Sequence, residues 1–162
     1  MRSSDPYSFV EAKSCLYYPD PDQVDLVTRR WNLPEEYFEF ISKFSPLEVE
    51  FTLRGSAESS TLYGIDDIAA GQLGFSVNGI TGELIEDWPS NYLVIAQRWG
   101  DPFVIDVSKH TDKVPVYYAK HGLGDWKFTR KYNSLVQFLE SIAIAKWDGY
   151  RDVLPKVIRG LT

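Results

Sequence analysis

The sequence predicts an α+β fold in a single domain, with a mainly antiparallel, mixed sheet of about five to six strands flanked by helices. Three observations lead to this expectation: an apolar hairpin near the middle of the chain, an amphipathic helix before it and a capped helix after it. Helices, then a run of strands, then a closing helix are typical of the α+β class. The chain has 162 residues, which suits one domain with a sizeable core.

The predicted hairpin occupies the middle of residues 88–107. Its two strands, 92–96 and 103–107, are apolar on both faces, as expected for strands in the middle of a covered sheet. Residues 98–102 between them contain Gly and Pro, which favour a chain reversal. We therefore expect the sheet to grow outward from this hairpin. Asp106, the one charge in the second strand, should either face solvent or be paired.

Two helices are predicted before the hairpin. Asp20 can cap the first and Pro21 suits its first position, and the helix should end around Asn32. The second begins at Pro34 and carries a broad apolar stripe opposite its charged side chains. The expected core positions of the two helices are Val24, Val27, Trp31, Leu33, Tyr37, Phe40, Ile41 and Phe44.

The last long helix should begin after Asn133 or Ser134. Gln137 completes an S-x-x-Q capping box with Ser134, and residues 148–149 (Asp-Gly) should end the helix. Its expected core positions are Leu135, Phe138, Leu139 and Ile142.

The other segments are shorter and more polar. A half-exposed strand is expected at 49–53, a flexible loop at 54–60, short strand pieces and turns at 71–86, and a strand at 114–119 with Pro115 at an edge. The core of the domain should span about 20–146. The N-terminal segment 1–19, with a weak helix signal at 5–14, and the C-terminal tail 150–162 should be peripheral.

Three stretches, in order, resemble the SUKH superfamily, named after a yeast regulator of cell-wall glucan synthesis and its bacterial relatives. The central stretch reads WP, YLVIA and GDPFVID; LPEEYFEF lies upstream, and VY followed by YNSLVQFL lies downstream. The resemblance covers roughly residues 20–145. The sequence departs from the family pattern after the upstream stretch LPEEYFEF, where residues 44–47 read FSPL in place of an Asn-Gly-Gly turn.

Composition narrows the possible partners. The net charge is −6 and no run of Lys or Arg occurs, which disfavours nucleic-acid binding and favours a basic protein partner. The alternative is that this charge only maintains solubility. Cys15 is the single cysteine, so no intramolecular disulfide can form. Neither an apolar run of about 20 residues nor a signal-peptide core is present, and we expect a cytoplasmic location without membrane contact.

The sequence shows no catalytic pattern, and we predict neither an enzyme, nor a metal site, nor a cofactor. His110 and His121 lack metal-ligand spacing, and residues 71–82 lack both the Walker and the dinucleotide patterns. A small hydrolase remains an alternative that would need two carboxylates in one pocket. The carboxylate pairs in sequence are Asp66–Asp67, Glu86–Asp87 and Asp101–Asp106.

Six residues in or beside turns are candidates for a partner-binding surface. Trp99 and Trp126 are candidate exposed anchors, with core packing as the open alternative, whereas core packing is favoured for Trp88. The acidic residues expected to rim them are Asp87, Asp101 and Asp125.

The resemblance implies a function for such a surface. Bacterial SUKH-like proteins are mostly immunity proteins, which bind and neutralise a secreted toxin, commonly a nuclease. We therefore expect a monomer or weak dimer that binds a basic toxin domain. The alternative is a regulatory scaffold related to cell-wall synthesis, as implied by the yeast member.

Overall fold

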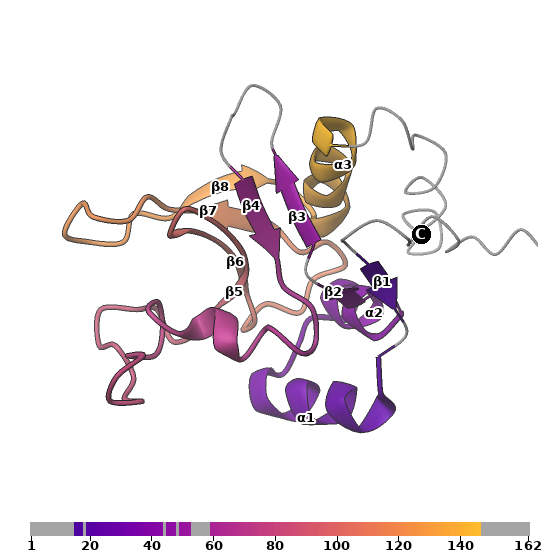
Figure 1. Cartoon of the computed structure of the whole chain (residues 1–162), viewed down its shortest axis with the longest axis horizontal. Helices are drawn as coiled ribbons and strands as arrows, with labels where there is room; N and C mark the ends of the chain where they lie inside the picture. The colour runs from indigo at the N-terminus through magenta and orange to yellow at the C-terminus, as the bar shows by residue number, and fades with distance from the viewer. Residues whose placement is uncertain (1–14, 18, 44, 48, 53–58, 147–162) are drawn as a thin grey trace, which may run out of the picture.

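The computed structural model describes residues 15–17, 19–43, 45–47, 49–52 and 59–146 (Figure 1). These residues form three α-helices, a short 3-10 helix, a six-stranded sheet and a two-stranded sheet. In chain order the elements are β1 (Cys15–Tyr17), α1 (Pro21–Trp31), α2 (Glu35–Lys43), β2 (Ser45–Leu47), β3 (Val49–Thr52), β4 (Ser59–Leu62), η1 (Ala70–Gln72), β5 (Tyr92–Arg98), β6 (Asp101–Asp106), β7 (Val116–Tyr118), β8 (Thr129–Tyr132) and α3 (Leu135–Lys146).

The large sheet is an antiparallel meander with the order β3-β4-β5-β6-β7-β8. Strands β5 and β6 lie in its middle, and residues 93–96 and 102–106 are buried. The α+β fold and the central hairpin predicted from the two-sided apolar pattern are therefore confirmed. Arg98 pairs with Asp101 across the hairpin, so the reversal is shorter than predicted and consists of Trp99 and Gly100.

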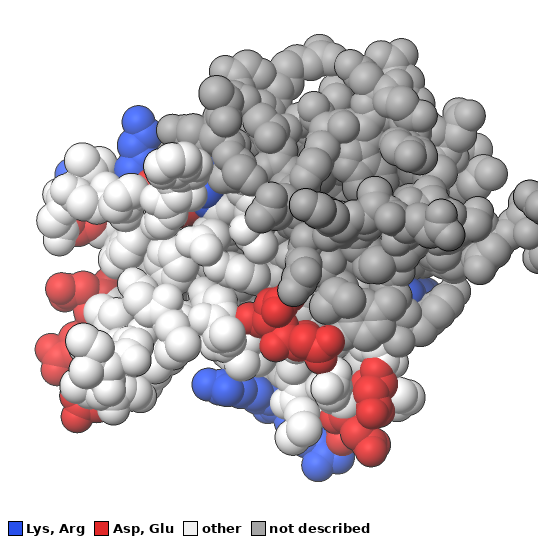
Figure 2. Space-filling view, viewed as in Figure 1, with Lys and Arg blue, Asp and Glu red and all other residues white. Residues whose placement is uncertain are grey.

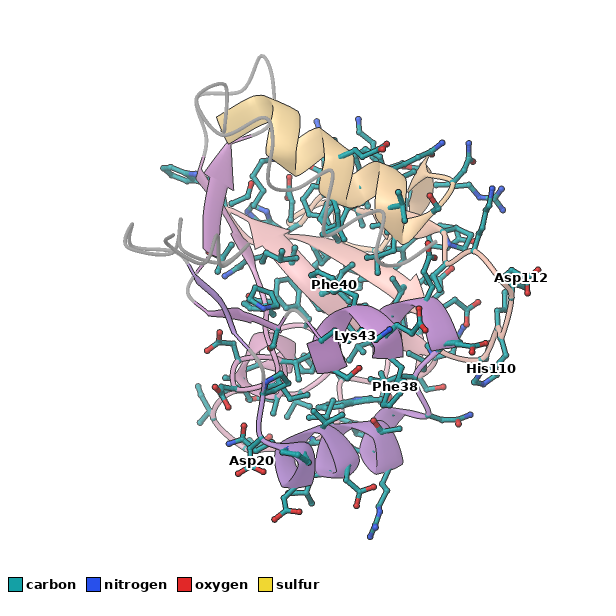
Figure 3. The ribbon with its side chains drawn as sticks, turned by 90° about the vertical axis from the view of Figure 1, so that its right-hand side faces the viewer. Asp20, Phe38, Phe40, Lys43, His110 and Asp112 are labelled. Atoms are coloured by element: carbon teal, nitrogen blue, oxygen red, sulfur yellow. The ribbon has the colours of Figure 1, made fainter. Side chains whose placement is uncertain are left out.

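Helices α2 and α3 cover one face of this sheet (Figure 3). Their contribution to the core matches the predicted stripes, since Tyr37, Phe40 and Ile41 of α2 and Phe138 of α3 are buried. Phe138 packs against Phe103 of β6 with ring centroids 5.2 Å apart. These large fully buried side chains fix the helices to the central hairpin through apolar burial.

The opposite face of the central strands is covered by the segment between β4 and β5. Gln72 is the main polar link: its Nε2 donates to the carbonyls of Ile68 at 2.7 Å and Val94 at 2.9 Å, and its Oε1 accepts the Val94 N–H at 3.0 Å. The side chain is buried, so its hydrogen bonds satisfy backbone groups of β5 that would otherwise lack partners at the bulge between Val94 and Ala96.

Residues 45–47, where the sequence departs from the family turn, contact the backbone of residues 64–65 closely. The buried Ser45 Oγ accepts the Ile65 N–H at 2.7 Å. A Cβ on Gly64 would lie 1.6 Å from the Pro46 carbonyl oxygen, so no larger residue fits there. The segments 45–47 and 63–65 are therefore joined tightly where the family pattern has an Asn-Gly-Gly turn.

The predicted helix caps are present. The Asp20 carboxylate accepts the Asp22 N–H at 2.9 Å, and Asn32 ends α1 in the left-handed conformation. At α3, the Ser134 hydroxyl accepts the Gln137 N–H at 3.1 Å, and the Gln137 side chain accepts the Asn133 N–H at 2.9 Å. This is the predicted capping box, except that Gln137 accepts the N–H of Asn133 and not that of Ser134.

Three predictions about strands need correction. Ser59–Leu62 was predicted to begin as a loop but forms β4, because pairing with β3 and β5 overrides its polar composition. The strand predicted at 114–119 is limited to Val116–Tyr118 and is internal, because the unpredicted β8 covers its outer side. Strands β1 and β2 were also not predicted. The helix signal at 5–14, Phe44 and the end of the last helix lie outside the described residues.

Candidate protein-binding surface

The structure divides the six candidate residues into two groups at opposite ends of β5. The indole N–H of Trp88 donates to the Tyr92 carbonyl at 2.9 Å, at the start of the strand, whereas Trp99 follows its last residue, Arg98. At about 3.3 Å per residue, the length of β5 separates the two ends by roughly 20 Å. The first group contains Asp87, Trp88, Asp125 and Trp126, and the second contains Trp99 and Asp101.

Trp88 lies in the core, as the sequence favoured for this residue, and only 5% of it is exposed. Its ring contacts Phe75, Trp126 and Phe128 with centroid separations of 5.8, 5.2 and 5.4 Å. Phe128 in turn contacts Tyr92 at 4.8 Å. We call these five rings the aromatic cluster. It joins the segment before β5 to the loop between β7 and β8, so Trp88 positions the surface without being part of it.

Trp126 is half-buried, so it is neither a free anchor nor a fully buried core residue. Its ring packs against Phe75 and Trp88 of the aromatic cluster, and it also lines a hollow of about 250 Å³ formed with Lys120 and residues 122–125. The neighbouring Asp125 is exposed and lies 3.6 Å from Lys127 Nζ. Asp87, beside Trp88, is also exposed.

Trp99 is the exposed tryptophan of the set, with 72% of its surface accessible. It occupies the first position of the two-residue turn between β5 and β6, at φ 52°, and Gly100 follows at φ 88°. Turns with two positive φ values favour Asn-Gly, and a bulky residue at such a position is an outlier. The structure therefore displays a large aromatic ring to solvent in a conformation that costs free energy.

Asp101 fixes the base of this turn. Its carboxylate accepts hydrogen bonds from the Tyr118 hydroxyl, from the His121 N–H at 2.9 Å and from His121 Nδ1 at 2.7 Å. Arg98, opposite it in the hairpin, donates to the same Tyr118 hydroxyl. Asp101 was expected within the chain reversal at 98–102; it instead begins β6 and accepts hydrogen bonds from the loop after β7.

These contacts determine the charge state of the group. Burial raises the pKa of Asp101, but the hydrogen bonds from Tyr118 and His121 outweigh it, so its pKa lies below the ordinary value. Burial and the bond to Asp101 raise the pKa of Tyr118. Asp101 is therefore a half-buried anion whose oxygens are hydrogen-bonded within the protein, and it supports the turn that carries Trp99 instead of offering its charge to a partner.

Asp106 is also paired, at the other end of β6. It accepts from Ser108 Oγ at 2.6 Å and Asn91 Nδ2 at 2.8 Å, and Lys109 Nζ lies 3.1 Å away. Burial raises the pKa of Asp106, but these hydrogen bonds lower it by more, and the net pKa is about 2. Since Asp101 and Asp106 occupy the two ends of one strand, they do not form a catalytic pair.

Carboxylates do gather in another hollow, of about 450 Å³, between α2 and the start of α3. Its acidic lining residues are Glu35, Glu36, Glu39 and Asp112. Glu36 is already hydrogen-bonded, since its Oε2 accepts the Val114 N–H at 2.5 Å.

In the part of the chain that the structure describes, no group of three or more His, Cys, Asp or Glu residues is placed to hold a metal ion. Within the same residues, no helix has the length and apolarity needed to span a bilayer.

Residues 73–87 form a projecting segment, which we call the arm and which was not predicted as a binding surface. Leu73, Ile80 and Leu84 on the arm are exposed. The sequence feature that could have identified this surface is its charge, because residues 55–97 contain six of the 23 acidic residues and none of the 17 basic residues. This segment therefore carries −6, and the charges of the rest of the chain cancel. Figure 2 shows acidic side chains at the edge of the lower-left lobe that the arm forms.

The fold and these surfaces define a small α+β domain with an exposed aromatic turn and an acidic, partly apolar arm, which is typical of a protein-binding module. Residues 19–141 match the SMI1 / KNR4 family (SUKH-1). The chain belongs to this family, and membership supports a role in protein–protein interaction. Comparisons with curated proteins and with solved structures found no match.

Proposed function

We propose that this protein is a cytoplasmic immunity protein that binds a basic toxin domain one-to-one and blocks its active surface. Family membership supports protein binding, and the net charge of −6 supports a basic partner. The mechanism is steric occlusion: acidic side chains accelerate the encounter, and an aromatic anchor slows dissociation. No chemical step by this chain is needed.

The observation that carries this proposal is the conformation of Trp99. A non-glycine residue at positive φ costs about 1–2 kcal/mol, and Asn would occupy this position at lower cost. Backbone outliers that persist on a surface indicate function, and Trp is among the residue types most enriched at binding hot spots. Trp99 is exposed and its turn is held by Asp101 and His121, which is how a rigid anchor is presented.

The test is a pull-down from lysate and medium of the source strain with the full chain as bait, read by mass spectrometry. A matched bait carries Trp99→Asn, which keeps the turn and removes the ring. Recovery of one basic toxin domain near equal stoichiometry by the unmodified chain, and at least tenfold less by the variant, is the expected result. Recovery of several cell-wall or signalling proteins would replace immunity with the regulatory scaffold. Equal recovery by both baits would remove Trp99 as the anchor.

A further inference from the structure

The arm exposes apolar side chains that the fold does not use. Ile80 is 97% exposed, Leu84 79% and Leu73 51%. Single exposed apolar residues are ordinary on protein surfaces, but several on one short projecting segment indicate an interaction site. Figure 1 shows the arm projecting away from the sheet below the β7–β8 loop.

Internal hydrogen bonds keep the arm ordered. The Asn78 side-chain oxygen accepts the N–H groups of Ile80 at 2.9 Å and Thr81 at 3.2 Å, and the Asn78 N–H donates to the Glu83 carbonyl at 2.8 Å. The Ile85 N–H donates to the Ser76 carbonyl at 3.0 Å. A partner therefore meets a preformed surface, and little conformational entropy is lost on binding.

The base of the arm is fixed to the body of the protein at both ends. Phe75 near its start and Trp88 just after its end are both buried, with ring centroids 5.8 Å apart. Both rings also contact Trp126. The apolar tip is thus presented on a rigid support, because the aromatic cluster holds both ends of the arm.

Charge identifies the kind of partner. Glu83, Glu86 and Asp87 are exposed on the arm, and residues 55–97 contain no Lys or Arg to neutralise them. An anionic membrane surface would be repelled. A second copy of this chain would bring the same acidic groups together, which is unfavourable. A basic protein surface complements both the charge and the apolar side chains.

We propose that the arm is a docking surface for a basic protein partner that offers an apolar pocket bordered by Lys or Arg. Ile80 and Leu84 enter the pocket, and Glu83, Glu86 and Asp87 face its basic border. This inference rests on the proposed function, since it assigns a second contact surface to the same toxin domain. The arm and Trp99 lie toward opposite ends of β5, roughly 20 Å apart, a span that one interface of standard size can cover.

The experiment is site-specific photo-crosslinking with the full chain. The photoreactive residue p-benzoylphenylalanine replaces Ile80, Leu84, Trp99 or, as the matched control, Leu26, which is 68% exposed on α1. Each protein is irradiated in lysate and medium of the source strain, and the attached peptide is identified by mass spectrometry. We expect adducts from positions 80 and 84 with a peptide rich in Lys or Arg, at least five times the yield from position 26. Charge reversal with E83K, E86K and D87K together should lower the yield at position 80 at least fivefold.

Each other outcome overturns a distinct statement. Equal yields at positions 26 and 80, or an unchanged yield after charge reversal, would show that the arm is not a specific acidic contact. An adduct joining two copies of this chain would replace the basic partner with self-association. Adducts from position 99 alone would remove the arm and leave the proposed function intact. No adduct from positions 80, 84 and 99 would reject the arm and the proposed function together.

Discussion

Trp126 packs edge-on against Trp88, with ring centroids 5.2 Å apart and ring planes at 78°. The contact connects the loop between β7 and β8 to the segment that enters β5, and Phe75 and Phe128 each contact both tryptophan rings. Two surface segments far apart in sequence are therefore held in one arrangement by apolar packing. Changes in this cluster should alter both stability and the geometry of the arm.

The first prediction compares these two tryptophans. Trp88→Ala should lower the free energy of unfolding by about 3–5 kcal/mol, because it leaves a cavity among buried rings. Trp126→Ala should cost about 2 kcal/mol, since this ring is only half-buried. Leu26→Ala, at an exposed position of α1, is the control and should stay within about 0.5 kcal/mol. Urea unfolding measures all three, and equal costs for Trp88 and Trp126 would contradict the assignment of Trp88 to the core.

The second prediction concerns Trp99. Trp99→Asn should raise the free energy of unfolding by about 1 kcal/mol, because Asn tolerates the positive φ of this position. Loss of an aromatic anchor should at the same time weaken binding of the toxin domain by roughly 2 kcal/mol, about 30-fold. Urea unfolding and calorimetric titration test the two halves separately. A variant that gains stability and binds as well as the unmodified chain would show that Trp99 is not an anchor.

The third prediction addresses the buried Gln72. Gln72→Ala should cost about 2–4 kcal/mol, because the Val94 N–H and carbonyl lose their buried partner. Gln72→Glu is the informative control: its carboxylate cannot donate to the Val94 carbonyl, and its burial raises its pKa above that in the unfolded chain. The unfolded state then binds fewer protons than the folded state, so the variant should regain stability as the pH falls from 7 to about 5. A pH-independent loss in this variant would contradict the prediction.

The fourth prediction follows from Asp106, whose folded-state pKa is lowered to about 2 from an ordinary value of 3.8. Because the unfolded chain takes up a proton at higher pH than the folded protein, this group stabilises the fold above about pH 4. The contribution, about 2 kcal/mol, is lost as the pH falls from 4 to 2. Urea unfolding across this range should show a steeper decline for the unmodified chain than for Asp106→Asn. Parallel pH profiles would show that the Ser108, Asn91 and Lys109 contacts do not stabilise the carboxylate.

The fifth prediction uses two glycines as a matched pair. Gly64→Ala should cost about 3 kcal/mol or more, because the new Cβ would overlap the Pro46 carbonyl oxygen. Gly79→Ala should change stability by less than about 0.5 kcal/mol, since a Cβ there meets nothing within 4 Å and its φ is not in the left-handed region. Thermal unfolding of the two variants is sufficient. Equal effects would mean that the 45–47 and 63–65 segments are not in close contact.

Local sequence patterns were sufficient to predict the elements that are specified by residues close together in the sequence. The caps of α1 and α3 and the stripe of α2 could be predicted because helix signals lie within a few residues of one another. The central hairpin could be predicted because strands buried on both faces need apolar residues at every position. Polar β4 and β8 carry no such signal, because backbone pairing places them in the sheet: β4 pairs with β5, which is distant in sequence, and β8 pairs with β7.

The surface depended on tertiary structure in the same way. The sequence placed aromatic and acidic residues beside turns, and its net charge indicated a basic partner. Only the fold decided that Trp88 is enclosed by Phe75 and Phe128, that the Asp101 carboxylate is hydrogen-bonded by Tyr118 and His121, and that Ile80 and Leu84 face solvent. Burial is a property of the packed chain, because the residues that cover a side chain come from segments that sequence patterns do not connect.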